Sequence, residues 1–564
     1  MKWKQRKQPG IYAEFISHGY KPLTATALCR AGIDDLTKAN DYLQNEEILN
    51  PALIRNIEVA TDIIWKHIYE GNLICVFGDY DADGITASAI MFLALRKLGA
   101  KVRVRLPDRI EEGYGISKKA ILELSELGSK LFVTVDNGVR AIEETEYAKS
   151  LGCDVVILDH HEPGEELPIA NALVDLHIPG ETYPYTELTG SGLAWKLAHY
   201  MLEQIGEHDF AMSLVDLAAI GTIADVAPLH GENRVIVKRA IKQMRHRLYD
   251  RAGILALMKD TTHITAEDIA YKVAPCLNAP GRLSSGGAAL PLILLIEDDL
   301  RIAFTLAQKV NEENERRKAL QASCYGEIRD QAEKRIARGE KVLVILSETA
   351  PSGIAGLLAG NLKEEFNRPA IVFCPKQDLS GKISWTGSAR SIDAFHMLAA
   401  IEQCSEHLIR YGGHKLAAGL TIEASLERLD AFRAAMNEVA ESMTEEDMER
   451  TQLWDLEFSP DEIVGDLFLE MDELEPFGAE APKPIIKVKA KLKDEGYSYM
   501  GADSQHLKLH TDKFDMVGFS LADKFIEMEL PGEVVAYGNL SVNNYRGKCT
   551  RQLSMVDFEP ARIE

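Results

Sequence analysis

The segment Leu73–Gly84 reads LICVFGDYDADG and sets three aspartates, one residue apart, directly after an uninterrupted apolar run. A continuous apolar run of this length is typical of a strand buried on both faces of a parallel sheet. The aspartates therefore follow the carboxyl end of that strand, where open α/β sheets bind their ligands. Three carboxylates in one turn repel one another unless cations neutralise them. The segment predicts a site for hard divalent cations, whose preferred ligands are oxygens.

Two more predicted strands end in the same way. The apolar run 131–135 leads into Asp136-Asn137-Gly138, and the run 155–158 leads into Asp159-His160-His161. The segments around these strands have helical patterns at residues 86–98, 117–127 and 140–151. Such alternation predicts a parallel sheet with right-handed crossovers, and all strands of that sheet end at one edge.

The predicted site gathers side chains from these strand ends and one from a later helical segment. Its members are Asp79, Asp81, Asp83, Asp136, His160, His161 and Asp225. Carboxylates mixed with imidazoles suit Mn²⁺ or Mg²⁺. Two such ions that share one carboxylate, roughly 3.5–4 Å apart, are the usual arrangement for in-line displacement at phosphorus. A neutral His160 fits a metal ligand, whereas His161 either joins the ligands or contacts a substrate phosphate.

The same string of aspartates also opens an EF-hand calcium loop, which is a different kind of site. That loop needs a glutamate at its twelfth position and a helix before its first aspartate. Counted from Asp79, the twelfth residue is Ile90, and an apolar strand pattern comes before Asp79. The sequence therefore excludes an EF-hand.

The strings 78–84, 135–138 and 159–161 together resemble the signature motifs of the DHH phosphoesterase superfamily. Within it, the chain resembles the RecJ family of single-strand-specific 5′→3′ DNA exonucleases, over about residues 20 to 558. The segments that carry the RecJ resemblance are Pro107–Arg109, Glu112–Gly115, Gly221–Leu229, Asn278–Leu283, Gly387–Ser391, Tyr411–His414 and Leu474–Gly478.

The resemblance implies a role for each candidate residue. One ion would be held by Asp79, Asp81 and Asp136, and the other by Asp83, Asp136, His160 and Asp225, with Asp136 bridging. Asp136, His160 and His161 would be the catalytic residues, with Asp159 orienting a histidine. The pocket for a 5′-terminal phosphate would be formed by Arg109, Arg282, Ser388 and Arg390, with further substrate contacts from Gly412, Gly413 and His414. Tyr114 would stack on a base or sugar, although ordinary packing is the alternative.

The expected fold class is α/β: a parallel-sheet DHH domain and a second α/β lobe joined by a long helix, followed by a C-terminal β-barrel of the OB type. The expected parts are a helical lead-in (1–50), a DHH catalytic domain (51–255), a helical connector (256–338), a DHH-associated domain (339–445) and an OB-fold domain (452–564). The proline-free segment 299–337 predicts the long helix, with a break near Gly326. Residues 444–451 are acidic and suggest a linker.

Charge limits the class of nucleic-acid binder. The net charge of −24 argues against a protein that coats DNA without specificity. Basic residues nevertheless gather in 485–493, where four lysines alternate with apolar residues and share one face of a predicted strand. Two interpretations stay open for that face: a solvated surface, or a groove that follows a nucleic-acid backbone.

Cysteines and hydropathy indicate the compartment. The eight cysteines are scattered without a Cys-x-x-Cys pair, which favours reduced thiols and no zinc site. No apolar run is long enough to span a membrane, and the basic start of the chain is not followed by an apolar signal core. These features predict a cytoplasmic protein.

The leading hypothesis is a two-metal exonuclease, active in DNA repair and recombination, that releases 5′-mononucleotides from single-stranded DNA. A single-stranded-DNA-binding protein and a helicase are candidate partners, and a monomer is expected. The nearest rival is a DHH enzyme that cuts short oligonucleotides or cyclic dinucleotides, and the expected C-terminal module argues for the longer substrate. A non-catalytic DNA-binding scaffold is the other rival, and the complete set of acidic and histidine residues argues against it.

Overall fold

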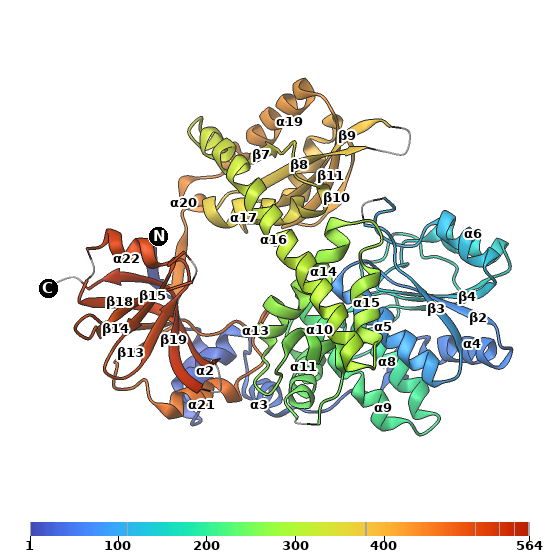
Figure 1. Ribbon diagram of the computed structural model, residues 1–564, viewed down its shortest axis with the longest axis horizontal. Helices are drawn as coiled ribbons and strands as arrows, with labels where there is room; N and C mark the ends of the chain where they lie inside the picture. The colour runs from blue at the N-terminus through green and yellow to red at the C-terminus, as the bar shows by residue number, and fades with distance from the viewer. Residues whose placement is uncertain are drawn as a thin grey trace.

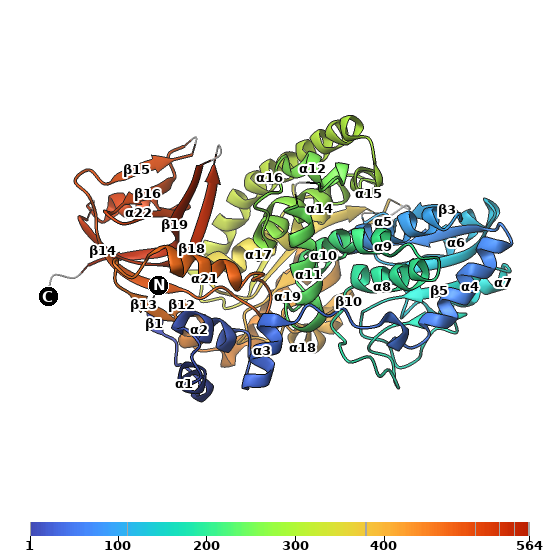
Figure 2. The same cartoon turned by 90° about the horizontal axis from the view of Figure 1, so that it is seen from below.

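The computed structural model describes residues 2–109, 111–246, 248–377, 381–501, 503–529, 531–545 and 548–561. Three lobes follow one another along the chain (Figure 1). An α/β lobe with a parallel sheet comes first, a second α/β lobe follows a long helix, and a β-rich lobe comes last. The N-terminal helices lie beside the β-rich lobe, so both ends of the chain are found there (Figure 2).

The sheet of the first lobe has the strand order β3-β2-β4-β5-β6, and every pair in it is parallel. The strands are β2 Leu73–Phe77, β3 Lys101–Arg105, β4 Ser129–Val135, β5 Asp154–Leu158 and β6 Ala172–Val174. The main helices are α4 Ile57–Tyr69, α5 Ala82–Lys97, α6 Lys118–Glu126, α7 Ile142–Ser150, α8 Gly190–Glu203, α10 Val215–Ala224 and α11 Gly231–Met244. The three strands predicted from apolar runs are confirmed, and so are the three predicted helices.

Helix α5 carries the third aspartate of the opening segment and is buried along most of its length, against α8, α10 and the sheet. Asp81 caps its first turn, because the side chain accepts hydrogen bonds from the backbone N–H groups of Asp83 and Gly84. A Cβ on Gly84 would lie 2.5 Å from the backbone nitrogen of Asp79. Only a glycine therefore lets the helix begin this close to the loop that precedes it.

A helical region leads from the first lobe to the second. Its helices are α12 Ala252–Met258, α14 Ala274–Leu283, α15 Ala289–Ile296 and α16 Leu300–Ile336. Helix α16 has 37 residues and spans about 55 Å at ~1.5 Å per residue. The predicted break near Gly326 is wrong, because the helix continues through this exposed glycine. A glycine inside a helix costs only about 1 kcal/mol, which the flanking turns and their packing offset.

The second lobe has a mixed sheet in the order β10-β11-β9-β8-β7, in which only β7 and β8 are parallel. Its elements are β7 Leu343–Leu346, α17 Ala355–Phe366, β8 Ala370–Gln377, β9 Ile383–Arg390, α18 Met397–Gln403, β10 Leu408–Gly413, β11 Ala417–Glu423 and α19 Leu426–Val439. Two hydrophobic cores cover the sheet, one shared with α16 and α17 and the other with α18 and α19. The second α/β lobe that the sequence predicted is confirmed, and α16 joins it to the first.

The third lobe is a curved sheet in the order β13-β14-β18-β19-β17-β16-β15. Its strands are β13 Leu456–Phe458, β14 Ile486–Lys491, β15 Tyr497–Met500, β16 His506–His510, β17 Asp515–Gly518, β18 Glu533–Tyr545 and β19 Lys548–Pro560, with helices α21 Gly465–Glu473 and α22 Ala522–Glu527. Among the strands described, no backbone pairing joins β13 to β15, so the barrel is open at that seam.

Three of the four alternating lysines, Lys487, Lys489 and Lys491, lie on β14 as predicted, with every second residue of the strand buried, whereas Lys493 lies beyond its end. Lys487 pairs with Glu457 at 3.0 Å and also lies over the ring of Trp454. Lys489 pairs with Glu533 at 3.7 Å. Because neighbouring carboxylates already neutralise these two lysines, the contacts favour a solvated surface over a groove for a nucleic-acid backbone.

The first fifty residues contain the helices α1 Gly10–Ser17, α2 Pro22–Arg30 and α3 Leu36–Gln44. They also contain strand β1 Lys2–Gln5, which pairs with β12 Thr451–Trp454 and was not predicted. Its partner lies about 450 residues away in sequence, so no local sequence pattern predicts the pairing. Trp3 of β1 stacks on Tyr537 with ring centroids 4.2 Å apart. The acidic segment expected to be a linker includes the short helix α20 Glu445–Met448.

Seven of the eight cysteines are free thiols: Cys29, Cys75, Cys153, Cys276, Cys324, Cys374 and Cys404. In the parts of the chain that the structure describes, none of the helices combines the length and the apolar character that a bilayer crossing requires.

Two helical glycines give opposite expectations when changed to alanine. Gly84→Ala should lower the free energy of unfolding by about 1–3 kcal/mol or more, because the new methyl group collides with the backbone of Asp79. Gly326→Ala should raise it by about 1 kcal/mol, because nothing lies within 4 Å of that position. Thermal or urea denaturation of both variants checks the pair. Shifts of the same sign would contradict the packing described for α5.

Candidate metal centre

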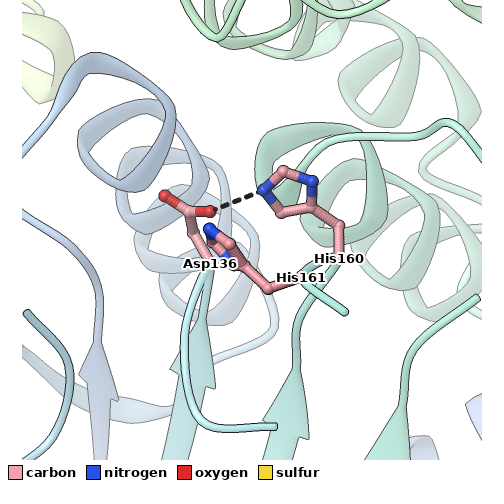
Figure 3. Close-up of side chains that lie close together, drawn as sticks. All are labelled: Asp136, His160 and His161. Atoms are coloured by element: carbon pink, nitrogen blue, oxygen red, sulfur yellow. Dashed lines mark hydrogen bonds and ion pairs between the residues drawn. The ribbon is translucent and has the colours of Figure 1, made fainter. Parts of the chain in front are cut away.

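The predicted ligands converge at the carboxyl edge of the parallel sheet. Three sets of side chains each place ligand atoms within 4.8 Å of one another. The sets are Asp79, Asp81 and Asp136; Asp83, His160 and Asp225; and Asp136, His160 and His161. Asp136 and His160 each belong to two sets, and Nε2 of His160 lies 3.0 Å from Oδ1 of Asp136 (Figure 3). The structure thus brings together all seven residues that were predicted at this site.

Asp136 is central and has an unusual backbone. Its φ of 62° lies in the left-handed region, which few residues other than glycine occupy. Its N–H donates to the carbonyl of Leu158, and Asn137 ties the ends of β2 and β4 together by donating to the carbonyls of Phe77 and Val135. Strain of this kind persists only where the surrounding structure over-determines it, which is common at functional sites.

Asp83 is held from the opposite side by α8 and α10. Its Oδ1 accepts a hydrogen bond from the N–H of Ser191, in the first turn of α8. Its other oxygen, Oδ2, lies 3.8 Å from Nε2 of His160. Nε2 of His160 lies 3.9 Å from a carboxylate oxygen of Asp225, the residue that caps the carboxyl end of α10.

Two glycines make room for these carboxylates. A Cβ on Gly190 would lie 2.4 Å from the Cβ of Asp136, and one on Gly221 would lie 2.3 Å from Oδ1 of Asp83. Sequence reasoning missed Gly190 and Ser191. The signal that could have found them is the string Thr189-Gly190-Ser191-Gly192, a glycine-rich helix start of the kind that lets backbone approach a ligand closely.

The residues fit a pair of divalent cations. Oδ1 of Asp79 and Oδ2 of Asp83 are buried, yet neither has a hydrogen-bond partner among the described residues. Burial, followed by the charge of Asp81, raises the pKa of Asp79. Burial also raises the pKa of Asp136, with the charge of Asp83 as the next cause. A buried anionic oxygen without a partner is costly, and a hard cation supplies the missing ligand interaction.

The two histidines differ in their partners. Burial lowers the pKa of His160, which keeps the ring neutral, as a metal ligand must be. Burial would also lower the pKa of His161, but Asp159 outweighs it through a hydrogen bond of 2.7 Å and raises the pKa to about 9. Asp159 itself accepts hydrogen bonds from Val139 and His160 as well. A cationic His161 favours contact with a substrate phosphate over metal ligation.

Several arginines lie close to one another beside the carboxylates. Burial, and then the charge of Arg109, lower the pKa of Arg282 to about 9, and Arg317 and Arg390 contribute in the same direction. Burial and Arg109 lower the pKa of Arg390 as well. Arg390 lies 3.4 Å from the hydroxyl of Ser388. Guanidinium groups this close repel one another, and a phosphate bound between them would match their planar geometry.

This arginine pocket is built from both α/β lobes. Arg109 follows β3 and lies over the ring of Tyr80 at 4.7 Å, and Arg282 lies on α14 and donates to the carbonyl of Gly353. Ser388 and Arg390 lie on β9 of the second lobe. A Cβ on Gly356 would lie 2.9 Å from the hydroxyl of Ser388, so a glycine at the start of α17 lets this helix lie close to Ser388.

The remaining predicted contacts lie around the same edge. The hydroxyl of Tyr114 donates to the carbonyl of Asp136 at 3.1 Å and lies 3.1 Å from Nδ1 of His161. A cavity of about 320 Å³ is lined by Tyr114 and His161 from the first lobe and by His414 from the second. Gly412 and Gly413 close strand β10 just before His414. No described contact joins Gly412 to the metal ligands, so its role stays a prediction.

Three parts of the chain match known family models. Residues 73–222 match the N-terminal domain of the DHH family, residues 339–442 match the DHHA1 domain, and residues 454–557 match the RecJ OB domain. The single-stranded-DNA-specific exonuclease RecJ of Bacillus subtilis (strain 168) is 35% identical over 548 residues, which cover 95% of this chain and 68% of that protein. The RecJ of Escherichia coli (strain K12) is 30% identical over 536 residues, which cover 90% of this chain and 91% of that protein.

The chain belongs to the RecJ family. A solved RecJ structure from Thermus thermophilus, in complex with Mn²⁺, superposes with a TM-score of 0.81 at 27% identity and covers 100% of this chain and 80% of that one. A second RecJ structure from the same organism contains Mg²⁺, with a TM-score of 0.75 at 26% identity. The resemblance to RecJ and the α/β fold class with an OB domain, both predicted from sequence, are confirmed.

Two substitutions at this RecJ centre should change stability in opposite directions without metal. Asp136→Asn should raise the melting temperature of the chelator-treated protein, because it removes one of several crowded charges and asparagine tolerates the left-handed backbone. Asp159→Asn should lower stability by about 1–3 kcal/mol, because an amide cannot replace the carboxylate that accepts from Val139 and His161.

Adding Mn²⁺ gives a further test that distinguishes the roles of Asp136 and Asp159. The wild-type melting temperature should rise with Mn²⁺, since a ligand that binds only the folded state stabilises it. In Asp136→Asn that rise should be largely lost. An equal rise in wild type and Asp136→Asn would show that the carboxylate does not hold a cation.

Proposed function

We propose that this RecJ-family protein hydrolyses single-stranded DNA from its 5′ end and releases 5′-mononucleotides. The observation that carries the proposal is the adjacency of two oppositely charged clusters. The carboxylate centre lies beside the arginine pocket, close enough that the charge of Asp81 acts on Arg282. A terminal phosphate bound by the arginines would leave the next phosphodiester at the carboxylates.

Two divalent ions, Mn²⁺ or Mg²⁺, would be held by Asp79, Asp81, Asp83, Asp136, His160 and Asp225. When bound, they would activate a water for attack on phosphorus and stabilise the negative charge that develops on the phosphoryl oxygens. The RecJ structures solved with Mn²⁺ and with Mg²⁺ support both ions.

The other side chains would position the substrate. Arg109, Arg282 and Arg390 would bind the 5′-phosphate by bidentate hydrogen bonds, with Ser388 as a further donor. His161, kept cationic by Asp159, would neutralise an oxygen of the scissile phosphate. Tyr114 is 52% exposed and has its hydroxyl fixed at Asp136, so its ring would stack on the terminal base or sugar.

Strand selectivity would come from the arrangement of the lobes. The arginine pocket draws on Arg109 and Arg282 from one side and on Arg390 from the second lobe, so the strand end would enter between them. We attribute the exclusion of duplex to this shared entrance. The third lobe would contact the single strand farther from its end, which is what OB folds do.

The wider setting is part of the same proposal. We assign 51–255 as the catalytic domain, 339–445 as the DHH-associated domain and 452–564 as the OB-fold domain, with 256–338 as connector and 1–50 as lead-in. The matched segments 73–222, 339–442 and 454–557 support these bounds. We place the enzyme in the cytoplasm, in DNA repair and recombination, as a monomer that works with a helicase and a single-stranded-DNA-binding protein.

End-labelled substrates test the activity directly. With Mn²⁺ or Mg²⁺, the protein should release mononucleotides from a 5′-labelled single DNA strand in the first turnovers, and should leave blunt duplex and single-stranded RNA largely intact. Asp136→Ala should abolish hydrolysis while the circular dichroism spectrum stays that of the wild type. Preferential cleavage of a dinucleotide over the long strand would instead favour the short-oligonucleotide activity.

The arginine pocket makes a prediction about the chemistry of the strand end. Wild-type enzyme should degrade a 5′-phosphorylated strand faster than a 5′-hydroxyl strand, and Arg109→Ala should reduce that preference about 10- to 100-fold, the value of a lost charged hydrogen bond. Arg301→Ala is the matched control, because that side chain is 93% exposed on α16. Equal rates on both ends in wild type would count against a phosphate pocket.

A further inference from the structure

The carboxyl end of α10 holds Asp225 in a closed turn. The N–H of Val226 donates to the carbonyl of Ile223, and the N–H of Ala227 donates to that of Thr222, both at 3.2 Å. This is a Schellman closure, in which the residue after the cap takes a left-handed conformation and is usually glycine. Here it is Val226, with a φ of 60°, and a β-branched residue is strained in that region. The turn therefore depends on contacts beyond its own residues.

Those contacts come from the third lobe. The N–H of Leu229 donates to the carbonyl of Ala479 at 2.9 Å. A Cβ on Gly478 would lie 2.6 Å from Cδ1 of Leu229, so the two residues touch without room for a side chain. Leu229 is 2% exposed and Ala481 is 1% exposed, and both belong to the hydrophobic core of the first lobe. The turn 478–481 of the third lobe is therefore built into the catalytic lobe.

Arg234 lies on α11, shortly after Leu229 in the sequence, and holds the same segment of the third lobe. Arg234 is 2% exposed, and its guanidinium lies 3.9 Å from the centroid of the Tyr42 ring. It donates to the carbonyls of Leu474 at 2.7 Å, Glu475 at 3.3 Å, Pro476 at 2.6 Å and Tyr42 at 3.1 Å. A cavity of about 960 Å³ lies between α11 and the segment 472–476 beside this contact.

We infer that the third lobe positions Asp225 through the contact of Gly478 and Ala479 with Leu229, and thereby sets the affinity for one of the two cations. Asp225 belongs to the ligand set with Asp83 and His160 and not to the set of Asp79, Asp81 and Asp136. Displacing this turn would therefore weaken the binding of one ion and leave the binding of the other unchanged. The inference rests on the proposed metal centre and gives the third lobe a second role besides binding the strand.

A Mn²⁺ titration of the full-length protein tests this role, with free Mn²⁺ measured by electron paramagnetic resonance. Gly478→Ala should raise the dissociation constant of one ion about tenfold or more, the range typical of residues that orient metal ligands. The dissociation constant of the other ion should stay within about twofold, since its ligands do not touch this turn. The matched control is Gly532→Ala, in the same lobe, where nothing lies within 4 Å of the added methyl group.

A second substitution separates positioning from general damage. Leu229→Ala makes room beside Gly478, so adding Gly478→Ala to it should cause little further loss of Mn²⁺ affinity, whereas independent effects would add. Arg234→Lys is an alternative variant if Gly478→Ala does not fold, because a lysine cannot reach the same three carbonyls of the third lobe. Arg234→Lys should raise the dissociation constant of the same ion.

The outcomes divide clearly. An equal loss of affinity for both ions, with a matching fall in melting temperature, would overturn the inference in favour of a structural role. Unchanged Mn²⁺ affinity with weaker single-stranded-DNA binding would overturn it in favour of a strand-binding role. Asp225→Asn is the benchmark: if wild type binds two ions and Asp225→Asn does not weaken either, then the assignment of the centre itself is wrong.

Discussion

Repulsion between carboxylates at the edge of one parallel sheet is the constraint on which the rest of this structure depends. Burial raises the pKa of Asp79 and of Asp136, and two buried oxygens in the cluster have no hydrogen-bond partner in the part of the chain that the structure describes. The fold around them is arranged to hold these groups close in spite of that repulsion, with glycines at 84, 190 and 221 and a left-handed aspartate at 136. Cations bound at this site would relieve that repulsion and so stabilise the folded state.

A cluster of the opposite sign balances the first. Burial and then the neighbouring arginines lower the pKa of Arg282, and Asp81 is the nearby carboxylate that opposes this shift. Each cluster gathers charges of one sign and would be stabilised by a ligand of the opposite sign. In the proposed function, divalent cations would neutralise the carboxylates, and the 5′-phosphate of the DNA end would neutralise the arginines.

Sequence reasoning succeeded where the cause is local. The run 73–77 and its aspartates predict a buried strand and a cation site from one segment, and the strands ending at 136 and 159 follow by the same pattern. It failed where the cause is a distant contact. Ser191 supports Asp83 from a helix more than a hundred residues away, and strand β1 pairs with a segment near residue 451. Gly326 misled the prediction of a break, because the packing of α16 outweighs the preference of one residue.

The unbroken length of helix α16 limits where a residue can be inserted in this chain. The helix runs without interruption for 37 residues between the part of the chain that supplies Arg282 and the lobe that supplies Arg390. One inserted residue would turn everything beyond it by about 100° and advance it by about 1.5 Å. A single-codon insertion in this helix would thus swing Arg390 to another side of the molecule. A surface loop absorbs an inserted residue locally, whereas an insertion in α16 would change the relative rotation of the two lobes.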